Sequence, residues 1–392
     1  MKRLLDIYTG KLIQQGLAEE NRILFLGLDA DLISNRPEAQ DSGELSKVFG
    51  QMNINSLLYA QPAEPYLSII RFLGEQDNDR LTPSDCETRT FLHDIPIIPE
   101  LNAAAVVKAL SYRKAAIVRG QGIISYGTVS PEQAFVSFSS VCFSTFVKFF
   151  TDVMFAAADC RRKRISIDRR TLSAYENITG NLFQNLQTAE DFNALLPGTD
   201  EDIYAALAAT GKRLVRERLV DSSFGNISYV HGNTIYISQT GSSLEHLETC
   251  IDAVPLDGSS SAGITASSEL SAHMGIYRAT GKKAIIHGHP KFTVIRSMSC
   301  REEGCDLSTC YKICRKPRFL NGVPVVSGEI GTGPAGLART VPEAMTGRRA
   351  VIVYGHGVFA AGSEGLQEPL SLIRSIEQNC REEYLRNISQ LL

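Results

Sequence analysis

The chain lacks an excess of either charge: its 392 residues hold 40 Lys and Arg against 43 Asp and Glu, a formal net charge of −3. A mildly negative chain offers no electrostatic attraction to phosphate backbones, so we expect no nucleic acid among its partners. Its 43% hydrophobic and 21% charged residues are typical of an ordinary soluble globular protein. Composition therefore indicates a packed domain protein whose partners are not nucleic acids.

The sequence also lacks a secretory leader and an uninterrupted membrane span. Residues 1–15 start basic but contain neither a continuous apolar core nor a small-residue cleavage site, so we expect no signal peptide. The most apolar run, Val136–Ala158, carries Lys148 and Asp152 near its middle together with several Ser and Thr. This mixture predicts a buried helix of a globular domain and no membrane partner. The nine cysteines are an odd number without a signal peptide, which favours a reducing cytoplasm.

The length predicts two domains, and the chain resembles itself. Phe91–Ile98 (FLHDIPII) is similar to Phe319–Val326 (FLNGVPVV), and Ala115–Gly127 is similar to Ala350–Gly362. Self-similarity of this kind indicates duplicated supersecondary units.

A breaker followed by a helix start, Leu196-Pro197-Gly198-Thr199-Asp200, predicts where the second domain begins. We therefore expect a first domain over residues 1–175, a linker over 176–199 and a second domain over 200–392. In the second domain a predicted helix over about 202–219 is followed by short apolar strands such as Thr234–Ser238. Alternating strands and helices predict a layered α/β architecture.

Seven histidines are present, and six of them lie in the second half. The segment Ala284–Pro290 (AIIHGHP) is strand-like, and a strand directs residues i and i+2 to the same side, so His287 and His289 can face one point. A second buried run, AVIVYGHG, ends in His356, and TASSEL supplies Glu269. Three imidazoles and a carboxylate suit Zn²⁺ or another divalent transition metal.

The first half carries no such ligands. The displacement that aligns Phe91 with Phe319 places Tyr59 at the position of His287 and Gln61 at that of His289, while Gln121 falls at that of His356. Tyrosine and glutamine are poor zinc ligands compared with imidazole. The first domain is therefore predicted to keep the scaffold without the metal.

The second half resembles the class II aldolase/adducin family, which includes the fuculose-phosphate aldolases. Five motifs occur in the family's order over about residues 200–380. They are Gly225-Asn226-Ile227-Ser228, Thr240-Gly241, Ser267-Ser268-Glu269, His287-Gly288-His289-Pro290 and Gly355-His356-Gly357. The resemblance implies a layered α/β/α fold with a mostly antiparallel central sheet, here duplicated in tandem, and a homo-oligomer.

The resemblance also implies an activity. The family chemistry is a metal-dependent lyase reaction, the reversible aldol cleavage of a small, phosphorylated hydroxy-ketone through a metal-stabilised enediolate. Glu269 would serve both as a ligand and as general acid or base, and Glu rather than the Asp of the epimerase branch favours carbon–carbon bond chemistry. Tyr311, in the loop after the His-x-His strand, would be a proton donor supplied by a neighbouring subunit, or else a packing or surface tyrosine.

A substrate-phosphate pocket is implied at the Gly-Asn loop, the Thr-Gly turn and the paired serines. Backbone N–H groups at glycines and short hydroxyls can hold an anion without a large basic patch. The alternative is that the serines only serve turns and helix caps. The implied substrate-binding residues are Gly225, Asn226, Thr240, Gly241, Ser267 and Ser268.

One loop departs from the family. It places four cysteines within residues 299–315, namely Cys300, Cys305, Cys310 and Cys314. They fit a second zinc, an iron–sulfur cluster, redox pairs, or inert packing, and neither a zinc ribbon nor a ferredoxin spacing is present. Flanking Lys312, Arg315 and Lys316 would favour thiolates.

Two rival functions stay open. The same scaffold supports dehydratases, epimerases and decarboxylases, and nothing outside the metal ligands separates these reactions. A non-catalytic, adducin-like interaction protein is the other alternative. Against it, a purely structural module has no need for the complete Glu-His-His-His set.

Overall fold

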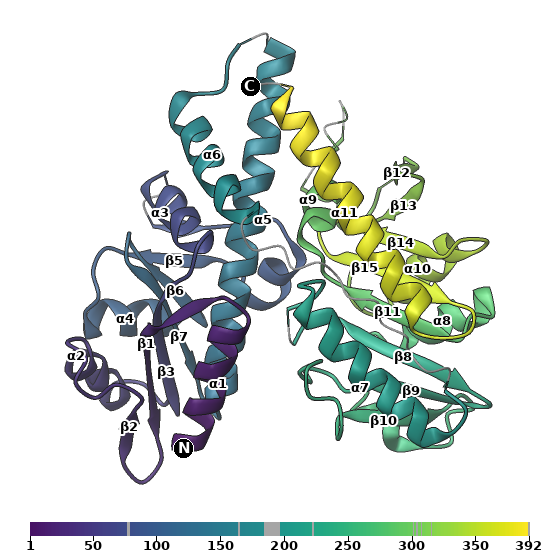
Figure 1. The fold of residues 1–392 in the computed structure, drawn as a ribbon, viewed down its shortest axis with the longest axis horizontal. Helices are drawn as coiled ribbons and strands as arrows, with labels where there is room; N and C mark the ends of the chain where they lie inside the picture. The colour runs from purple at the N-terminus through teal and green to yellow at the C-terminus, as the bar shows by residue number, and fades with distance from the viewer. Residues whose placement is uncertain are drawn as a thin grey trace. The chain divides into compact units, whose positions relative to one another are not determined.

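The computed structural model describes residues 1–76, 79–163, 165–183, 197–221, 223–300, 302, 305–306, 308–314 and 316–390. The chain divides into two compact units, Met1–Gln187 and Thr188–Leu392. The predicted linker, residues 176–199, lies partly outside the described residues. In Figure 1 the first unit runs from purple to teal and the second from teal to yellow.

The first unit is built on a seven-stranded sheet in the order β2-β1-β3-β7-β6-β5-β4. Its strands are β1 (Ala18–Leu28), β2 (Leu32–Ser34), β3 (Ser56–Pro62), β4 (Arg80–Leu81), β5 (Ile95–Ile98), β6 (Ala115–Val118) and β7 (Gly122–Gly127). Its helices are α1 (Lys2–Gln14), α2 (Ser42–Ser46), α3 (Tyr66–Gln76), α4 (Ala103–Leu110), α5 (Pro131–Lys163) and α6 (Arg169–Phe183), with a 3-10 turn η1 (Lys47–Gly50) and a π turn η2 (Thr88–Leu92).

The second unit is built on an eight-stranded sheet in the order β10-β9-β8-β11-β15-β14-β13-β12. Its strands are β8 (Asn226–His231), β9 (Thr234–Ser238), β10 (Ile251–Pro255), β11 (Ala284–Gly288), β12 (Arg318–Leu320), β13 (Val323–Val326), β14 (Ala350–Val353) and β15 (Gly357–Gly362). Its helices are α7 (Asp200–Arg216), α8 (Leu270–Thr280), α9 (Lys291–Ser297), α10 (Leu337–Met345) and α11 (Gln367–Ser389), with a 3-10 turn η3 (Ser261–Ile264).

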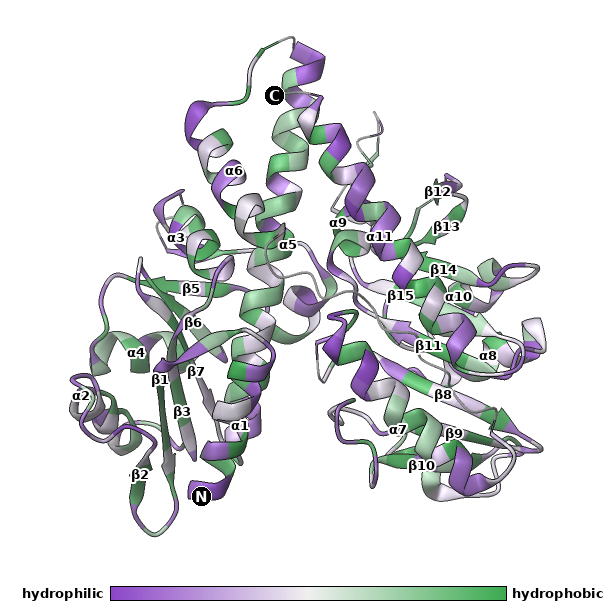
Figure 2. Cartoon of the chain, in the orientation of Figure 1, coloured by the Kyte–Doolittle hydropathy of each residue, from purple (hydrophilic) through white to green (hydrophobic). Residues whose placement is uncertain are grey.

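Helices pack on the sheet of each unit, in agreement with the predicted mixed α/β fold. In the second unit, α8 and α10 pack on one face, where Ile276 and Val341 join Ile285 and Phe359 in a buried core. Helices α7, α9 and α11 contact strands β8, β14, β15 and β11. Figure 2 shows hydrophobic residues along the strands of both sheets. The mixed α/β fold is thus confirmed in each unit.

Seven strands of the second sheet follow the order of the first sheet, with β10 as an additional edge strand, and the central strand pairs share their register. Both are antiparallel except for one parallel pair, β5 with β6 in the first unit and β13 with β14 in the second. Strand β3 pairs with β7 so that Tyr59 faces Ile124, and β11 pairs with β15 so that His287 faces Phe359. On the other side, Leu24 of β1 faces Tyr59, just as Asn226 of β8 faces His287. The residues that the sequence comparison aligned therefore occupy equivalent places in the two sheets.

Helix α5 contains the apolar run Val136–Ala158. Among the described helices it is the one that is long and apolar enough to cross a bilayer, and 72% of its most apolar window is buried. It packs on β3 and β7, and Lys148 pairs with Asp152 one turn further along at 2.8 Å. These contacts are those of a core helix that satisfies its central charges locally.

The start of α7 agrees with the sequence signal. Thr199 is the N-cap, its hydroxyl accepts the Asp202 N–H at 3.2 Å, and the Asp202 carboxylate accepts the Thr199 N–H at 3.0 Å. This reciprocal pair satisfies backbone donors that a helix leaves unpaired at its first turn. Helix α7, the first helix of the second domain, therefore begins where the Leu196-Pro197-Gly198-Thr199-Asp200 segment predicted.

We predict that Thr199→Ala opens the first turn of α7. Loss of an N-cap costs about 1 kcal/mol, which is roughly a fivefold increase in the exchange rate of the protected amides. Hydrogen exchange of peptides from α7, followed by mass spectrometry, measures the change. Thr249→Ala, at an exposed threonine, is the control. Equal exchange in both variants would contradict the capping role.

Candidate metal centre

Three histidines from separate segments of the second unit meet at one point. His287 lies on β11, His289 follows directly after that strand ends, and His356 lies in the turn between β14 and β15. Nε2 of His287 lies 3.1 Å from Nε2 of His289 and 3.4 Å from Nε2 of His356. Within the described part of the chain, this is the one group of three or more His, Cys, Asp or Glu with ligand atoms within 4.8 Å of one another. The structure therefore brings the three predicted histidines together.

Glu269 lies beside the same cluster. It is the N-cap residue of α8 and is 5% exposed. Its Oε2 lies 3.4 Å from Nε2 of His287, and its Oε1 lies 3.8 Å from Nε2 of His356. The amide of Asn226 donates a hydrogen bond from Nδ2 to Oε2 at 2.8 Å. The predicted carboxylate is thus placed against two of the imidazoles.

The distances between donor atoms fit a tetrahedral metal ion. Ligands at about 2.1 Å from a tetrahedral centre are roughly 3.4 Å apart, which is close to the spacings within this cluster. The Nδ1 of His287 lies 3.1 Å from the carbonyl oxygen of Val358, so that nitrogen carries the hydrogen and donates it. Its Nε2 lone pair then faces the other imidazoles, as a metal ligand requires.

Burial determines the charge of these groups. Burial holds the pKa of His287 well below its usual range, and the neighbouring imidazoles of His289 and His356 lower this pKa further. Burial alone lowers the pKa of His289 to about 3. Burial also raises the pKa of Glu269 to about 7, against the opposing hydrogen bond from Asn226. Neutral imidazoles are the form in which histidine binds a metal.

Two glycines allow the strands to carry these residues so close together. Gly225 has φ +86°, and a Cβ there would lie 2.6 Å from the carbonyl oxygen of His287. A Cβ on Gly357 would overlap the carbonyl oxygen of Gly288 and would lie 3.1 Å from Cε1 of His287. Only glycine tolerates both approaches without displacing the backbone. Of the six predicted substrate-binding residues, Gly225 therefore has a clear structural role.

The predicted phosphate residues lie along two adjacent segments. The Thr240-Gly241 turn follows the end of β9, and the Thr240 hydroxyl donates to the carbonyl of Ala266 at 3.0 Å. Next to it, the Ser267 N–H donates to the carbonyl of Ser238, and the Ser267 hydroxyl accepts the Glu269 N–H at 3.3 Å. Ser268 is exposed and Ser267 is buried. The turn and the serines are therefore neighbours, and one serine also supports the backbone of the glutamate.

The sequence prediction missed His273 and Tyr277, and it named Ser228 only as the last residue of a motif. His273, Ser228 and Tyr277 form a buried polar chain behind Asn226, through bonds of 2.6 Å from His273 to Asn226, 2.5 Å from His273 to Ser228 and 2.7 Å from Ser228 to Tyr277. Burial lowers the pKa of His273 to about 3. A signal was present, because Glu269, His273 and Tyr277 follow each other at intervals of four, which places them on one face of a helix.

Tyr311, the predicted proton donor, lies in the segment between α9 and β12. Its carbonyl accepts the Gly328 N–H at 2.9 Å, and the Lys312 ammonium lies 5.6 Å from the centre of its ring. Lys312 in turn pairs with Glu329 at 2.9 Å. These contacts hold Tyr311 against the Gly328 segment and do not join it to the histidines, so its role stays a prediction.

The four cysteines of the same segment are free thiols that differ in exposure: Cys310 is buried and Cys305 is exposed. Their sulfur atoms do not form a group within the 4.8 Å limit that the histidines meet. Burial, then the nearby thiols of Cys314, Cys300 and Cys305, raises the pKa of Cys310. The expectation of favoured thiolates is therefore wrong for Cys310.

The main reason is burial of the Cys310 thiol, and two of the flanking cations are also paired with carboxylates. Lys316 pairs with Glu302 and Lys312 pairs with Glu329, while Arg315 lies outside the described residues. A second metal or redox site in this loop stays a prediction.

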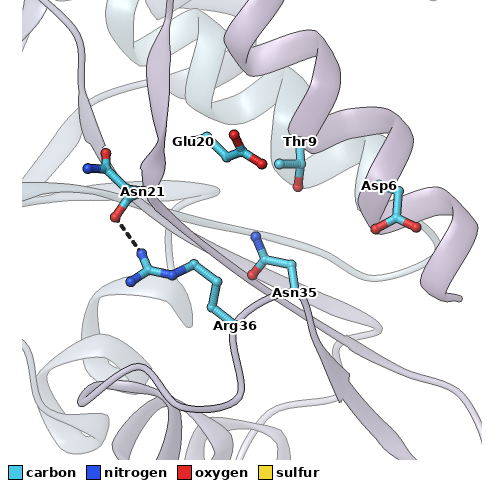
Figure 3. A pocket seen from close by; sticks show the side chains of 6 residues that line it. All are labelled: Asp6, Thr9, Glu20, Asn21, Asn35 and Arg36. Atoms are coloured by element: carbon cyan, nitrogen blue, oxygen red, sulfur yellow. Dashed lines mark hydrogen bonds between the residues drawn. The ribbon is translucent and has the colours of Figure 1, made fainter.

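A separate cavity of about 520 Å³ lies in the first unit (Figure 3). Its polar groups are used to join strands: Asn35 binds the backbone of Phe25 and Ile23, and Arg36 donates to the carbonyl of Asn21. The cavity is lined by Asp6, Thr9, Glu20, Asn21, Asn35 and Arg36. None of the predicted site residues lies there.

Residues 205–384 match the family model described as Class II Aldolase and Adducin N-terminal domain. No curated protein matches the sequence. Among solved structures, L-fuculose-1-phosphate aldolase from Thermus thermophilus has 28% identity and a TM-score of 0.39, covering 48% of this chain and 96% of that chain. A further L-fuculose 1-phosphate aldolase has 24% identity and a TM-score of 0.40, covering 48% and 87%. Sugar-phosphate aldolase from Thermotoga maritima has 20% identity and a TM-score of 0.37, covering 48% and 96%.

The family match agrees with the resemblance that the five motifs predicted, and it covers residues 205–384 of the second unit. At the level of this superfamily, the match supports an aldolase-type lyase.

We predict that the protein binds one equivalent of zinc per chain and that His287→Ala/His289→Ala loses it. The double substitution removes two of the four clustered donors, while the first unit offers none at the equivalent strand positions. Plasma mass spectrometry of the folded proteins measures the metal. The matched control is His231→Ala/His246→Ala, which removes two exposed histidines of the same unit. Zinc retained by the first variant would place the metal elsewhere, with the cysteine loop as the next site to test.

We also predict that Gly225→Ala destabilises the protein by about 1–3 kcal/mol and weakens zinc binding, because its Cβ would press on the backbone of His287. Urea unfolding followed by circular dichroism, with zinc titration of the folded variant, measures both effects. Gly232→Ala is the matched control, since that glycine also has a positive φ, +57°, but no heavy atom near its Cβ. Equal losses in the two variants would show that the close approach is unimportant.

Proposed function

We propose that the second unit is a zinc-dependent lyase of the class II aldolase type, acting on a small phosphorylated hydroxy-ketone by reversible carbon–carbon bond cleavage. The observation that carries this proposal is the convergence of Glu269, His287, His289 and His356 in one buried cluster. The family match of residues 205–384 supports the reaction class. The names of the sugar-phosphate and fuculose-phosphate aldolases that the chain resembles support a phosphorylated substrate.

The residues of the cluster divide into those that hold the metal and those that move a proton. His287, His289 and His356 would hold the ion with Glu269. When bound, the ion supplies Lewis acidity that stabilises negative charge developing on substrate oxygen. Glu269 is held by Asn226 on one carboxylate oxygen, and the other oxygen faces His356. In this arrangement the carboxylate is the group of the cluster that can accept or return a proton.

The phosphate of the substrate would lie at the Thr240-Gly241 turn and Ser267-Ser268. Thr240, Gly241 and Ser268 are exposed, and a substrate arriving from solvent can reach them. Backbone N–H groups of a turn and serine hydroxyls hold an anion without cationic side chains. Gly225 and Asn226 would line the pocket next to the carboxylate. Tyr311 would supply a proton to the leaving group, as the family resemblance implies.

We infer that the two units arose by tandem duplication, and that the first has lost the metal ligands. The support is the shared strand order and the equal register of the paired strands. Tyr59, Gln61 and Gln121 stand where the second unit has its histidines. Assembly as a homo-oligomer in a reducing cytoplasm is also proposed, from the family resemblance and the unpaired cysteines respectively.

A dehydratase, epimerase or decarboxylase would use the same four ligands, and an interaction protein would need none of them. The position of Glu269 as N-cap of α8, buried against two imidazoles, favours an enzyme over an interaction protein. Product analysis separates the remaining reactions, because each one leaves a different product.

We predict that the full chain, stripped with a chelator and reloaded with Zn²⁺, Co²⁺ or Mn²⁺, releases an aldehyde from at least one ketose phosphate of a panel. A hydrazine traps the aldehyde, and mass spectrometry identifies it. Glu269→Gln should lower the rate about 10²- to 10⁴-fold, because the amide cannot accept the proton. The control is Glu343→Gln, an exposed glutamate of the same unit. No aldehyde with any metal, or an epimer, an alkene or carbon dioxide in its place, would overturn the aldolase assignment.

A further inference from the structure

Behind the metal cluster, a chain of buried polar side chains runs from Glu269 into the core. Asn226 binds Glu269 through Nδ2 and His273 through Oδ1, at 2.8 and 2.6 Å. His273 continues to Ser228 and Ser228 to Tyr277, at 2.5 and 2.7 Å. The five side chains are at most 7% exposed, and His273 and Ser228 are 0% exposed. A buried chain of this kind is favourable only when every member is satisfied.

In this series of hydrogen bonds, every donor points toward the Glu269 carboxylate. A carboxylate only accepts hydrogen bonds, so the NH₂ group of Asn226 faces Glu269 and its oxygen faces His273. Nε2 of His273 must then carry the hydrogen, which leaves Nδ1 to accept from the Ser228 hydroxyl. The Ser228 oxygen in turn accepts from the hydroxyl of Tyr277. The Nε2–H tautomer of His273 therefore satisfies the hydrogen bonds to both Asn226 and Ser228.

The orientation of Asn226 depends on that tautomer. If Nδ1 carried the hydrogen instead, Nε2 would accept, and the amide would turn its NH₂ group toward His273. Its oxygen would then face the Glu269 carboxylate, two acceptors at hydrogen-bond distance with no hydrogen between them. His273 thus decides which end of the amide meets the carboxylate.

The first unit offers an internal comparison. Strand β1 places Leu24 opposite Tyr59 and Leu26 opposite Leu57, and the second unit places Asn226 opposite His287 and Ser228 opposite Ile285 in the same register. In these described strands, the positions of Asn226, Ser228 and His287 are therefore occupied by Leu24, Leu26 and Tyr59 in the first unit. Two members of the polar series and one histidine of the cluster are thus replaced together.

We propose that His273, held by Ser228 and Tyr277, is a positioning residue that fixes the Asn226 amide and thereby orients Glu269 against the histidine cluster. The inference rests on the proposed function, in which Glu269 binds metal and moves a proton. His273 is hydrogen-bonded to Asn226 and Ser228, and it acts on Glu269 through the Asn226 amide. Outer partners of metal ligands act in this way because they restrict the orientations of the ligand.

The first test is the tautomer of His273 in the full chain, read from long-range ¹H–¹⁵N correlations of the imidazoles. The Nε2–H form is expected with Zn²⁺ bound, when Glu269 is a carboxylate, and Ser228→Ala should add an Nδ1–H population. An Nδ1–H tautomer in the wild type would overturn the inference. This readout needs no turnover. If it holds and no aldehyde forms from any substrate, only the proposed function fails; if aldehyde forms and Nδ1–H is found, only this inference fails.

The second test is zinc affinity, measured by competition with a chromophoric chelator. His273→Leu should weaken binding about 10- to 100-fold. His273→Gln should recover most of the loss, because its Nε2–H can donate to Asn226 Oδ1. Thr280→Val is the control, since this hydroxyl on the same helix bonds the backbone of Ile276. Circular dichroism confirms that each variant is folded. Equal weakening by Leu and Gln would overturn the positioning role, and so would no weakening by Leu.

Discussion

The burial of one carboxylate and three imidazoles at a single point is the constraint on which the second unit depends. These groups lose water and must find partners among each other, among backbone groups and in a bound ion. Two consequences follow in the structure. The strands that carry them need glycine at the closest approaches, Gly225 and Gly357, and the glutamate needs a donor, which Asn226 supplies. The buried cluster therefore constrains which residues can surround the four clustered side chains.

The sequence predicted the ligands because their spacing carries a geometric meaning. His287 and His289 lie two apart, and the apolar residues before them predicted the strand. The reason given was only partly right: β11 ends at Gly288, so His289 reaches the cluster from the segment after the strand. The approach of Glu269 and His356 depends on strand pairing between distant segments, and no local pattern specifies that pairing.

Other parts of the site were not predicted, for different reasons. The spacing of Glu269, His273 and Tyr277 places them on one helix face, but the partners Asn226 and Ser228 are brought to His273 by β8, far away along the chain. The pKa of the Cys310 thiol was misjudged because the sequence does not show that this thiol is buried. Burial disfavours the thiolate, and a count of neighbouring charges in the sequence does not include that effect.

The equal register of the two sheets has a consequence for how such a protein can change. A sheet that forms the same pairings with Leu24, Leu26 and Tyr59 as with Asn226, Ser228 and His287 does not need the polar cluster in order to fold. Architecture and chemistry are therefore separable in this chain, unlike in small zinc domains, which unfold without their metal. A unit with this register can keep its framework without the metal ligands, and that framework is then free to acquire another use.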